Sequence, residues 1–311
     1  MWQCSIGKCM HLISRNHRKS MFFSHMVSAI CHNAEVLKNA IATNKPTDHL
    51  LKGKVLASVF YEPSTRTSAS FNVAMQRLGG RVVGIDEVSS SARKGESLED
   101  AIRVLSSYVD CLVLRHPGQG AVERVAAKST KPIINAGDGI GEHPTQALLD
   151  VFTIRNEIGT CNNLTITMVG DLKHGRTVHS LAKILTLYEG VKFRFVSPPN
   201  LSMPTEIKKY LDYQEFPSIE EAIPETDILY VTRIQRERFD DEEAYKKSCA
   251  NYAINASTLF GAKAELKILH PLPRVQEIDG QVDNDQRAAY FRQAENGLYV
   301  RMALLAMVME Q

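Results

Sequence analysis

The apolar residues of the chain fall into two alternating patterns from Lys52 onward. Short uninterrupted apolar runs such as "KVLASVFY" (54–61) are typical of buried strands. They alternate with stretches such as "RTSASFNVAMQRLGG" (66–80), where apolar residues recur every three or four positions and glycine follows the last of them. Repeated strand–helix units of this kind predict parallel sheets that carry helices on both faces.

The alternation also predicts two domains. A helical stretch at 145–157 ends the first series of strands, and a second series begins with "LTITMVGD" at 164–171. A chain of 311 residues is longer than one ordinary hydrophobic core supports. We therefore expect an α/β protein with two doubly wound parallel-sheet domains joined by a bridging helix. The first would be 1–148, completed by a C-terminal helix at about 290–311, and the second 149–289.

Composition limits the partners and the compartment. The 37 basic and 35 acidic side chains give a net charge of +2, so neither nucleic acid nor a membrane is expected as a partner. Six scattered cysteines lack the spacing of zinc ligands, which favours free thiols and a cytoplasmic protein. The first 34 residues contain no acidic side chain, as in transit peptides, but "MVSAICHNAEVLKNAI" (26–41) looks like a folded helix. Targeting is therefore the alternative interpretation of this segment.

The turn after the first predicted strand is rich in groups that bind anions. It contains, in order, Ser64, Thr65, Arg66 and Thr67. Ligands of parallel sheets bind beyond the carboxyl ends of the strands, and a helix that begins there points its first N–H groups at the same place. An arginine fork also matches phosphate oxygens. Ser64 by itself indicates a helix cap, so we expect it both to cap the helix and to contribute to an anion site.

Two further strand ends of the first domain carry polar candidates. Arg115 follows the third predicted strand, whereas His143 and Gln146 follow the fourth, at the start of the bridging helix. If Arg115 lies close to His143 in the fold, the two side chains could polarise a carbonyl group. His143 alone would be an ordinary helix-end residue. The "GDGIGE" run does not match a dinucleotide loop, because Glu142 stands at the third glycine position.

Arginines follow two strands of the second predicted domain. "GDLKHGRT" (170–177) has the spacing of a P-loop, but Arg176 stands where lysine belongs, and its planar fork suits a carboxylate. Arg233 and Gln235 follow another strand within "TRIQRER", which taken alone could be a solvated charged segment. Together, Arg176 and Arg233 would hold a ligand that carries two carboxylates.

Two loops complete the set of candidates. "HPLPR" (270–274) follows the last predicted strand, and its prolines favour a rigid turn that presents backbone carbonyls to an amine. "SSSARKGES" (89–97) contains Lys94, although its composition alone indicates a solvated loop. Ser97 and Asp100 form a capping-box pattern that predicts the start of the next helix.

Six motifs, in order from about Lys52 to the C-terminus, resemble those of aspartate carbamoyltransferases. The form they resemble is the domain of the multifunctional animal-type enzyme of pyrimidine biosynthesis. The motifs are "STRT", "LRHP", "EHPTQALLD", "MVGDLKHGRTVHSL", "TRIQRER" and "HPLPRVQEI". "STRT" and "HPTQ" by themselves would indicate the wider carbamoyltransferase superfamily. An ornithine carbamoyltransferase is expected to carry "HCLP" where this chain has "HPLP".

The resemblance implies the carbamoyltransferase fold and transfer of a carbamoyl group from carbamoyl phosphate to L-aspartate, with no metal or cofactor. The residues it implies for carbamoyl phosphate are Ser64, Thr65, Arg66, Thr67, Ser90, Lys94, Arg115, His143 and Gln146. Those it implies for aspartate are Lys94, Arg176, Arg233, Gln235, Leu272 and Pro273. Catalytic roles would fall to Arg66, Thr67, Lys94, Arg115 and His143.

The resemblance further implies a homotrimer in which Ser90 (or Ser91) and Lys94 enter the site of a neighbouring subunit. Association with other enzymes of pyrimidine biosynthesis is an additional expectation. Two alternatives stay open at this stage: an ornithine-specific carbamoyltransferase, and a catalytically silent module that binds ligands or supports assembly.

Overall fold

The computed structural model describes residues 17–86, 94–139, 141–234, 241, 243, 245 and 251–310. The chain forms two compact units, one from Met1–Leu149 with Glu295–Gln311 and the other from Asp150–Ala294. It passes from the first to the second within helix α6 (Pro144–Ile158) and returns within helix α11 (Tyr290–Met309). In the described part of the chain, no helix combines the length and the apolar character needed to cross a membrane.

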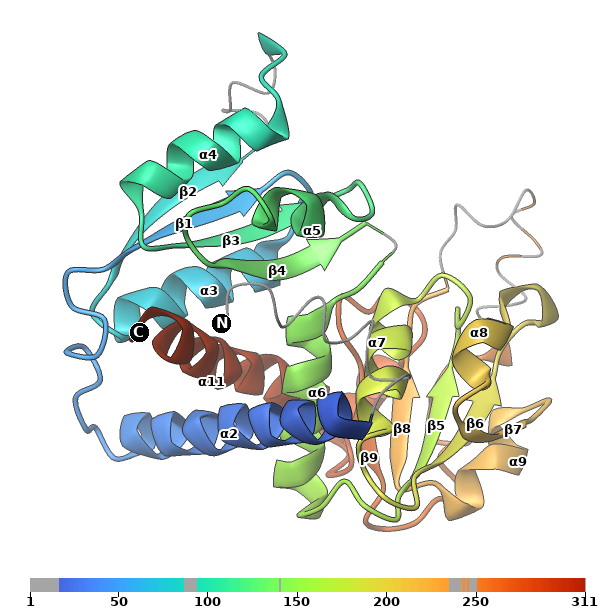
Figure 1. The fold of residues 1–311 in the computed structure, drawn as a ribbon. Helices are drawn as coiled ribbons and strands as arrows, with labels where there is room; N and C mark the ends of the chain where they lie inside the picture. Colours follow the sequence, from blue (N-terminus) through green and yellow to red (C-terminus); the bar gives the residue numbers. More distant parts are fainter. Residues whose placement is uncertain are drawn as a thin grey trace. The chain divides into compact units, whose positions relative to one another are not determined.

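A four-stranded parallel sheet in the order β2-β1-β3-β4 forms the centre of the first unit (Figure 1). Its strands are β1 (Val55–Phe60), β2 (Arg81–Asp86), β3 (Cys111–His116) and β4 (Ile133–Asp138). Helices α4 (Leu98–Tyr108) and α5 (Ala121–Ala126) cover one face, and α3 (Thr65–Arg77) covers the other (Figure 1). The central strands β1 and β3 are therefore buried almost throughout, as their continuous apolar runs predict.

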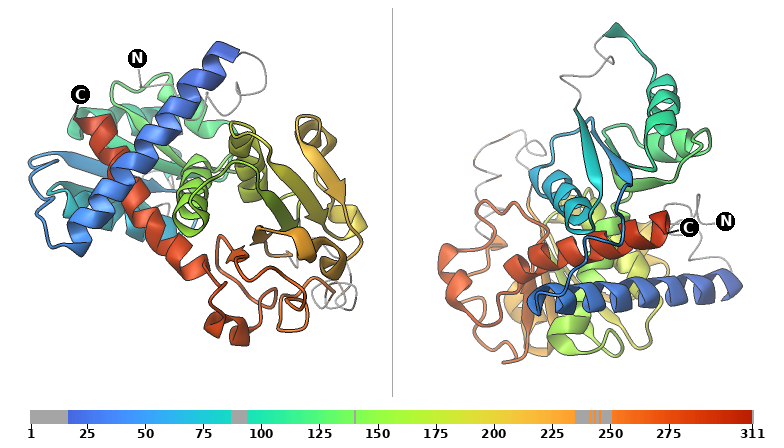
Figure 2. Two further views of the ribbon diagram at one scale, coloured as in Figure 1. Left: turned by 90° about the horizontal axis from the view of Figure 1, so that it is seen from below. Right: turned by 90° about the vertical axis from the view of Figure 1, so that its left-hand side faces the viewer.

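The first and the last described helices pack together in this first unit. Helix α2 (His17–Ala42) crosses α11, as the left view of Figure 2 shows. Lys38 Nζ donates a hydrogen bond to Asn296 Oδ1 at 3.2 Å. On α11, the guanidinium of Arg301 lies 5.2 Å from the ring centre of Phe71. The C-terminal part of α11 therefore packs against α3 as well as beside α2.

A five-stranded parallel sheet in the order β7-β6-β5-β8-β9 forms the second unit. Its strands are β5 (Thr165–Val169), β6 (Lys192–Val196), β7 (Asp212–Glu215), β8 (Ile228–Val231) and β9 (Lys267–Leu269). Its helices include α7 (Arg176–Leu185), α8 (Thr205–Lys208) and α9 (Ile219–Ala222), with 3-10 turns at Pro199–Leu201, Ile223–Glu225 and Gly280–Asn284. Both sheets are parallel with helices packed on them, so the predicted α/β architecture is confirmed.

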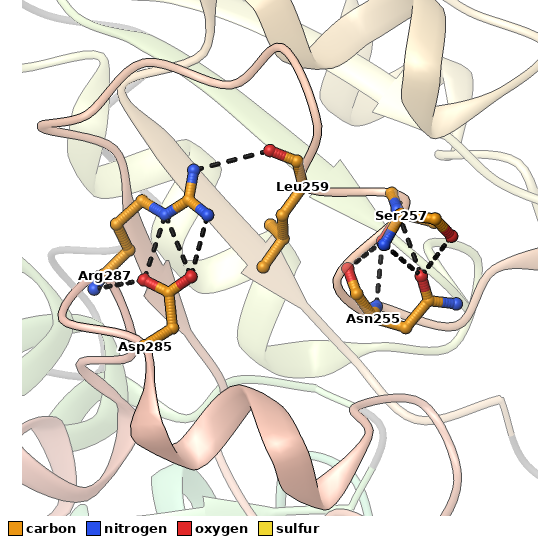
Figure 3. Close-up of polar contacts among 6 residues, drawn as sticks. Asn255, Ser257, Leu259, Asp285 and Arg287 are labelled. Atoms are coloured by element: carbon orange, nitrogen blue, oxygen red, sulfur yellow. Dashed lines mark hydrogen bonds and ion pairs between the residues drawn. The ribbon is translucent and has the colours of Figure 1, made fainter.

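Side-chain hydrogen bonds hold the irregular segments on either side of β9 (Figure 3). The guanidinium of Arg287 binds Asp285, with Nη2 2.7 Å from Oδ2, and donates through Nη1 to the carbonyl of Leu259 at 3.4 Å. Asn255 Oδ1 accepts the N–H of Ser257 at 2.9 Å. The stretch before β9 is therefore tied to the stretch that leads into α11.

Candidate active site

The strand order of the first unit reverses between β1 and β3, which pair side by side. In open parallel sheets, ligands bind beyond the carboxyl ends of the strands at such a reversal. The predicted anion-binding turn follows β1, and Arg115 lies near the end of β3. The two are in contact, because Arg115 Nη1 donates a hydrogen bond to Ser64 Oγ at 3.2 Å.

Ser64 occupies the N-cap position of α3, but its side chain makes no capping hydrogen bond. By contrast, Ser97 caps α4 as predicted, since its Oγ accepts the N–H of Asp100 at 3.1 Å. The prediction that the Ser64 side chain caps its helix is therefore wrong. Its hydroxyl is directed at Arg115, from which it accepts a hydrogen bond, and not at the first N–H groups of α3. The first N–H groups of α3 lack intrahelical acceptors, as in any α-helix, and a bound anion can accept their hydrogen bonds.

Glu62, which the sequence analysis did not single out, forms an ion pair with Arg115. Arg115 Nη2 lies 2.9 Å from Glu62 Oε1, and Arg115 Nε lies 3.2 Å from Oε2. A bidentate pair of this kind fixes the plane of the guanidinium. Glu62 lies two residues before Ser64, at the same strand end. That position is the feature of the sequence that could have identified it as part of the site.

Arg66 adds a second guanidinium beside Arg115. Nearby protein atoms that exclude water, and then the positive charge of Arg115, lower the pKa of Arg66. Both effects disfavour the charged form, and an anion between the two arginines would relieve the repulsion. Thr65 is exposed as the first residue of α3, whereas Thr67 is buried. The predicted cluster is thus a positively charged turn at the amino end of a helix.

His143 and Gln146 lie next to this edge of the sheet. Both side chains are buried, His143 directly before α6 and Gln146 in its first turn. The loop that carries them follows β4, and the N–H of Gly139 in that loop donates to the carbonyl of His116, the last residue of β3, at 2.9 Å. The structure therefore places His143 on the loop adjacent to the strand end that carries Arg115.

Lys94 is exposed in the short turn that precedes α4. Ser90 and Ser91, the predicted loop serines, lie outside the described residues. The loop connects the edge strand β2, which pairs with β1 alone among the described strands, to α4.

The strand order of the second unit reverses between β5 and β8. Arg176 is the first residue of α7, after β5, and Arg233 follows β8. The two strand ends approach closely at Gly170, which has φ +114°, and a Cβ there would lie 2.2 Å from the carbonyl oxygen of Thr232. The two arginines predicted to bind carboxylates therefore follow the carboxyl ends of two neighbouring strands, β5 and β8, at the point where the strand order reverses. Gln235 lies outside the described residues.

The "HPLP" turn follows β9 and has an unusual backbone. Leu272 has φ +54°, in the left-handed region that leucine seldom occupies, and the Leu272–Pro273 peptide is cis. The N–H of Leu272 donates to His270 Nδ1 at 2.8 Å, and His270 Nε2 lies 2.8 Å from Glu277 Oε1. Burial favours a higher pKa for Glu277, but the hydrogen bond from His270 and that from the Val275 N–H outweigh it, and the pKa is lowered.

Comparison with known proteins identifies the family. Residues 19–156 match the model for the carbamoyl-P binding domain of aspartate/ornithine carbamoyltransferases, and residues 162–308 match the model for their Asp/Orn binding domain. The chain is also 48% identical over 307 residues to the aspartate carbamoyltransferase catalytic subunit of Aliivibrio fischeri, covering 94% of this chain and 98% of that protein. The chain belongs to the aspartate carbamoyltransferase family.

Other relatives within the aspartate carbamoyltransferase family extend the comparison. The chain is 55% identical over 304 residues to the multifunctional protein CAD of Squalus acanthias, covering 96% of this chain but 13% of that protein's length. A solved structure of Trypanosoma cruzi aspartate transcarbamoylase, in complex with carbamoyl phosphate and aspartate, is 41% identical with a TM-score of 0.85. It covers 91% of this chain, and 92% of the solved chain is matched. The resemblance drawn from the six motifs is confirmed.

Proposed function

We propose that the protein is an aspartate carbamoyltransferase. It transfers the carbamoyl group of carbamoyl phosphate to the α-amine of L-aspartate and yields N-carbamoyl-L-aspartate and phosphate, a step of pyrimidine biosynthesis. The observation that carries this proposal is the contact of Arg115 with Ser64, with Arg66 close by, at the reversal of the first sheet. The related protein from Trypanosoma cruzi was solved with carbamoyl phosphate and aspartate.

We infer that the first unit binds carbamoyl phosphate. The phosphate accepts hydrogen bonds from the turn of Ser64, Thr65, Arg66 and Thr67, where a helix terminus and a guanidinium both favour an anion. Arg115 and His143, with Thr67, polarise the carbonyl oxygen, and Gln146 binds the carbamoyl amide. The ion pair with Glu62 supports this proposal because it orients the fork of Arg115.

The second unit is proposed to bind aspartate. Arg176 and Arg233 at the reversal of its sheet, together with Gln235, hold the two carboxylates through charge-assisted hydrogen bonds. The backbone carbonyls of Leu272 and Pro273 accept hydrogen bonds from the amine and the carbamoyl group. Acceptors suit the amine because they orient its hydrogens and leave its lone pair directed at the carbamoyl carbon.

The reaction needs positioning and electrostatic stabilisation more than a protein nucleophile. The aspartate amine attacks the carbamoyl carbon, a C–N bond forms, and the carbonyl oxygen gains negative charge next to Arg115 and His143. The C–O bond to phosphate then breaks, and the departing phosphate takes the proton that the amine loses. Each donor that faces the developing oxyanion is worth about 10²–10³ in rate.

We further propose a cytoplasmic homotrimer in which Lys94 and Ser90 (or Ser91) complete the site of a neighbouring subunit. The exposed position of Lys94 supports its availability to another subunit. The buried side chains of Cys31, Cys111 and Cys161 form no disulfide, which is compatible with a reducing compartment. The similarity to one segment of CAD supports association with other pyrimidine-pathway enzymes.

A paired substrate assay tests the proposed function. The protein is incubated with carbamoyl phosphate and either L-aspartate or L-ornithine, and phosphate and carbamoylated product are measured. We expect carbamoyl-aspartate and no citrulline. Product with ornithine alone would assign the chain to the other branch of the family. Binding of a phosphonacetyl-aspartate bisubstrate analogue without turnover would identify a silent module.

A further inference from the structure

The backbone of Leu272 is held by one side chain. Its φ of +54° is unfavourable for a residue with a branched side chain, and such a conformation persists where the surroundings impose it. Here the Leu272 N–H donates to Nδ1 of His270, two residues earlier. The imidazole therefore closes a small ring across the turn and sets the direction of the peptide groups on either side of Leu272.

The hydrogen bond from the Leu272 N–H fixes the tautomer of His270. Because a backbone N–H is always a donor, Nδ1 must present its lone pair, and the proton of the neutral ring is on Nε2. That proton faces Glu277 Oε1 at 2.8 Å. Glu277 Oε2 in turn accepts the N–H groups of Val275 and Gln276, each at 3.0 Å. Glu277 thus holds both the ring and the far end of the same loop.

The ring is also anchored from the core of the second unit. The N–H of His270 donates to Gln293 Oε1 at 2.8 Å, and Gln293 Nε2 donates to Asp150 Oδ1 at 2.7 Å. Tyr230 Oη donates to Asp150 Oδ2 at 2.9 Å. All four of these residues are buried, so the chain of hydrogen bonds is shielded from water and holds its members in one arrangement.

We propose that His270 is a positioning residue for the aspartate amine. Held as the Nε2–H tautomer by Glu277, its Nδ1 lone pair fixes the Leu272 peptide so that the carbonyls of the turn meet the nucleophile at the required angle. The inference rests on the proposed function, because it assumes that this turn receives aspartate. Misplacement of a reacting group by about 1 Å costs about 10²-fold in rate.

Two substitutions of His270 distinguish the role of Nδ1 from that of Nε2. In His270→Asn, the side-chain oxygen reaches the position of Nδ1 and can accept the Leu272 N–H, whereas contact with Glu277 is lost. In His270→Gln, the amide reaches the position of Nε2 and contacts Glu277, whereas the acceptor for Leu272 is lost. We expect His270→Gln to lower kcat by about 10²-fold and to raise KM for aspartate, and His270→Asn to retain kcat within about tenfold of the unmodified protein. Both should bind inorganic phosphate normally.

A control variant reports general destabilisation of the same unit. Thr226→Val removes the buried hydrogen bond between Thr226 Oγ1, shortly before β8, and Thr167 Oγ1 of β5, which are 2.6 Å apart, and also the bond that Thr226 Oγ1 donates to the carbonyl of Ala222. It should lower thermal stability without changing KM for aspartate. Equal losses in His270→Asn and His270→Gln, or unchanged kinetics in His270→Gln, would overturn the proposal.

The unmodified protein supplies a readout that does not depend on folding of any variant. With ¹⁵N-labelled histidine, the His270 ring should give the NMR signature of a neutral Nε2–H tautomer. A proton on Nδ1 would overturn the proposal. If the unmodified protein formed no carbamoyl-aspartate while the ring showed the expected tautomer, the proposed function would have failed. The local geometry would then stand without that role.

Discussion

The guanidinium of Arg115 lies against the carboxylate of Glu62, with Nη2 2.9 Å from Oε1 and Nε 3.2 Å from Oε2. The same guanidinium donates to Ser64. Arg115 is thus oriented by a fixed negative charge on one side, while Arg66 lies close enough for its pKa to be lowered by the charge of Arg115. An anion at this turn meets two arginines, one of which is already partly neutralised.

This geometry predicts that Arg115→Ala weakens phosphate binding and lowers kcat by about 10²–10³-fold. Part of the binding loss arises because the negative charge of Glu62 is no longer offset by Arg115 and repels the anion. Removing it as well, in Glu62→Ala with Arg115→Ala, should recover about 1 kcal/mol of phosphate affinity. Isothermal titration with inorganic phosphate measures all four corners of the cycle. Strictly additive losses would show that the ion pair has no influence on the anion.

Arg66→Ala is expected to abolish measurable turnover and to leave the fold intact, because the side chain is exposed and lies at a helix terminus. Arg66→Lys keeps the charge but loses the planar fork, so we expect intermediate phosphate affinity. Circular dichroism and phosphate titration at two ionic strengths provide the measurements. Unchanged kinetics in Arg66→Ala would remove the basis for the anion site.

Glu277 predicts a pH dependence of stability. Its pKa is lowered in the folded protein below the ordinary value of 4.5. A carboxyl group of this kind stabilises the fold above its unfolded pKa, and the contribution is lost as the pH falls through the folded pKa. The difference in unfolding free energy between the unmodified protein and Glu277→Gln should therefore have its maximum value at pH 6–7 and decrease below about pH 4.5. Urea titrations across this range measure it, and a difference that grew in acid would contradict the assignment.

Much of the site was predictable because parallel sheets place ligands at strand ends. The alternating apolar runs predicted two parallel-sheet units, and the polar residues after β1 and β3 proved to be in contact. The alternation could not reveal strand order. Only the pairing of β1 with β3, and of β5 with β8, shows that both candidate clusters lie where the order reverses.

The missed residues share a different property. Glu62, His270, Glu277 and Gln293 act on other protein groups. Some of their partners lie far away in the chain: 53 positions separate Glu62 from Arg115, and 143 separate Gln293 from Asp150. Ser64 shows the same limit. Its residue type favours a helix cap, but its hydroxyl accepts a hydrogen bond from Arg115, which lies 51 positions later in the chain. Local pattern nominates the groups at the strand ends, whereas long-range contacts decide what orients those groups.

Gly170→Ala tests the close approach of the two strand ends in the second unit. The new Cβ would lie 2.2 Å from the carbonyl oxygen of Thr232, and φ is +114°. We expect the free energy of unfolding to fall by more than about 3 kcal/mol, and KM for aspartate to rise because Arg233 follows Thr232.

Gly159→Ala is the matched control: its φ is +89° with no atom within 4 Å of the new Cβ. It should lose only about 1 kcal/mol and keep KM for aspartate. Equal destabilisation by both variants would mean that backbone conformation, not the contact with Thr232, sets the cost.

Lys94 provides a test of sites shared between subunits. If Lys94 acts in the site of a neighbour while Arg66 acts in its own subunit's site, Lys94→Ala and Arg66→Ala homotrimers should each be inactive. When the two variants are mixed, dissociated and reassembled, some sites receive Lys94 from one chain and Arg66 from the other. Activity should therefore reappear, with an upper limit of one restored site in each mixed trimer, and light scattering should report a trimer throughout. Two results would contradict sites shared between subunits: no recovery of activity in verified mixed trimers, and full activity in a strictly monomeric protein. Either would mean that Lys94 and Arg66 act in the same subunit's site or that Lys94 takes no part in the reaction.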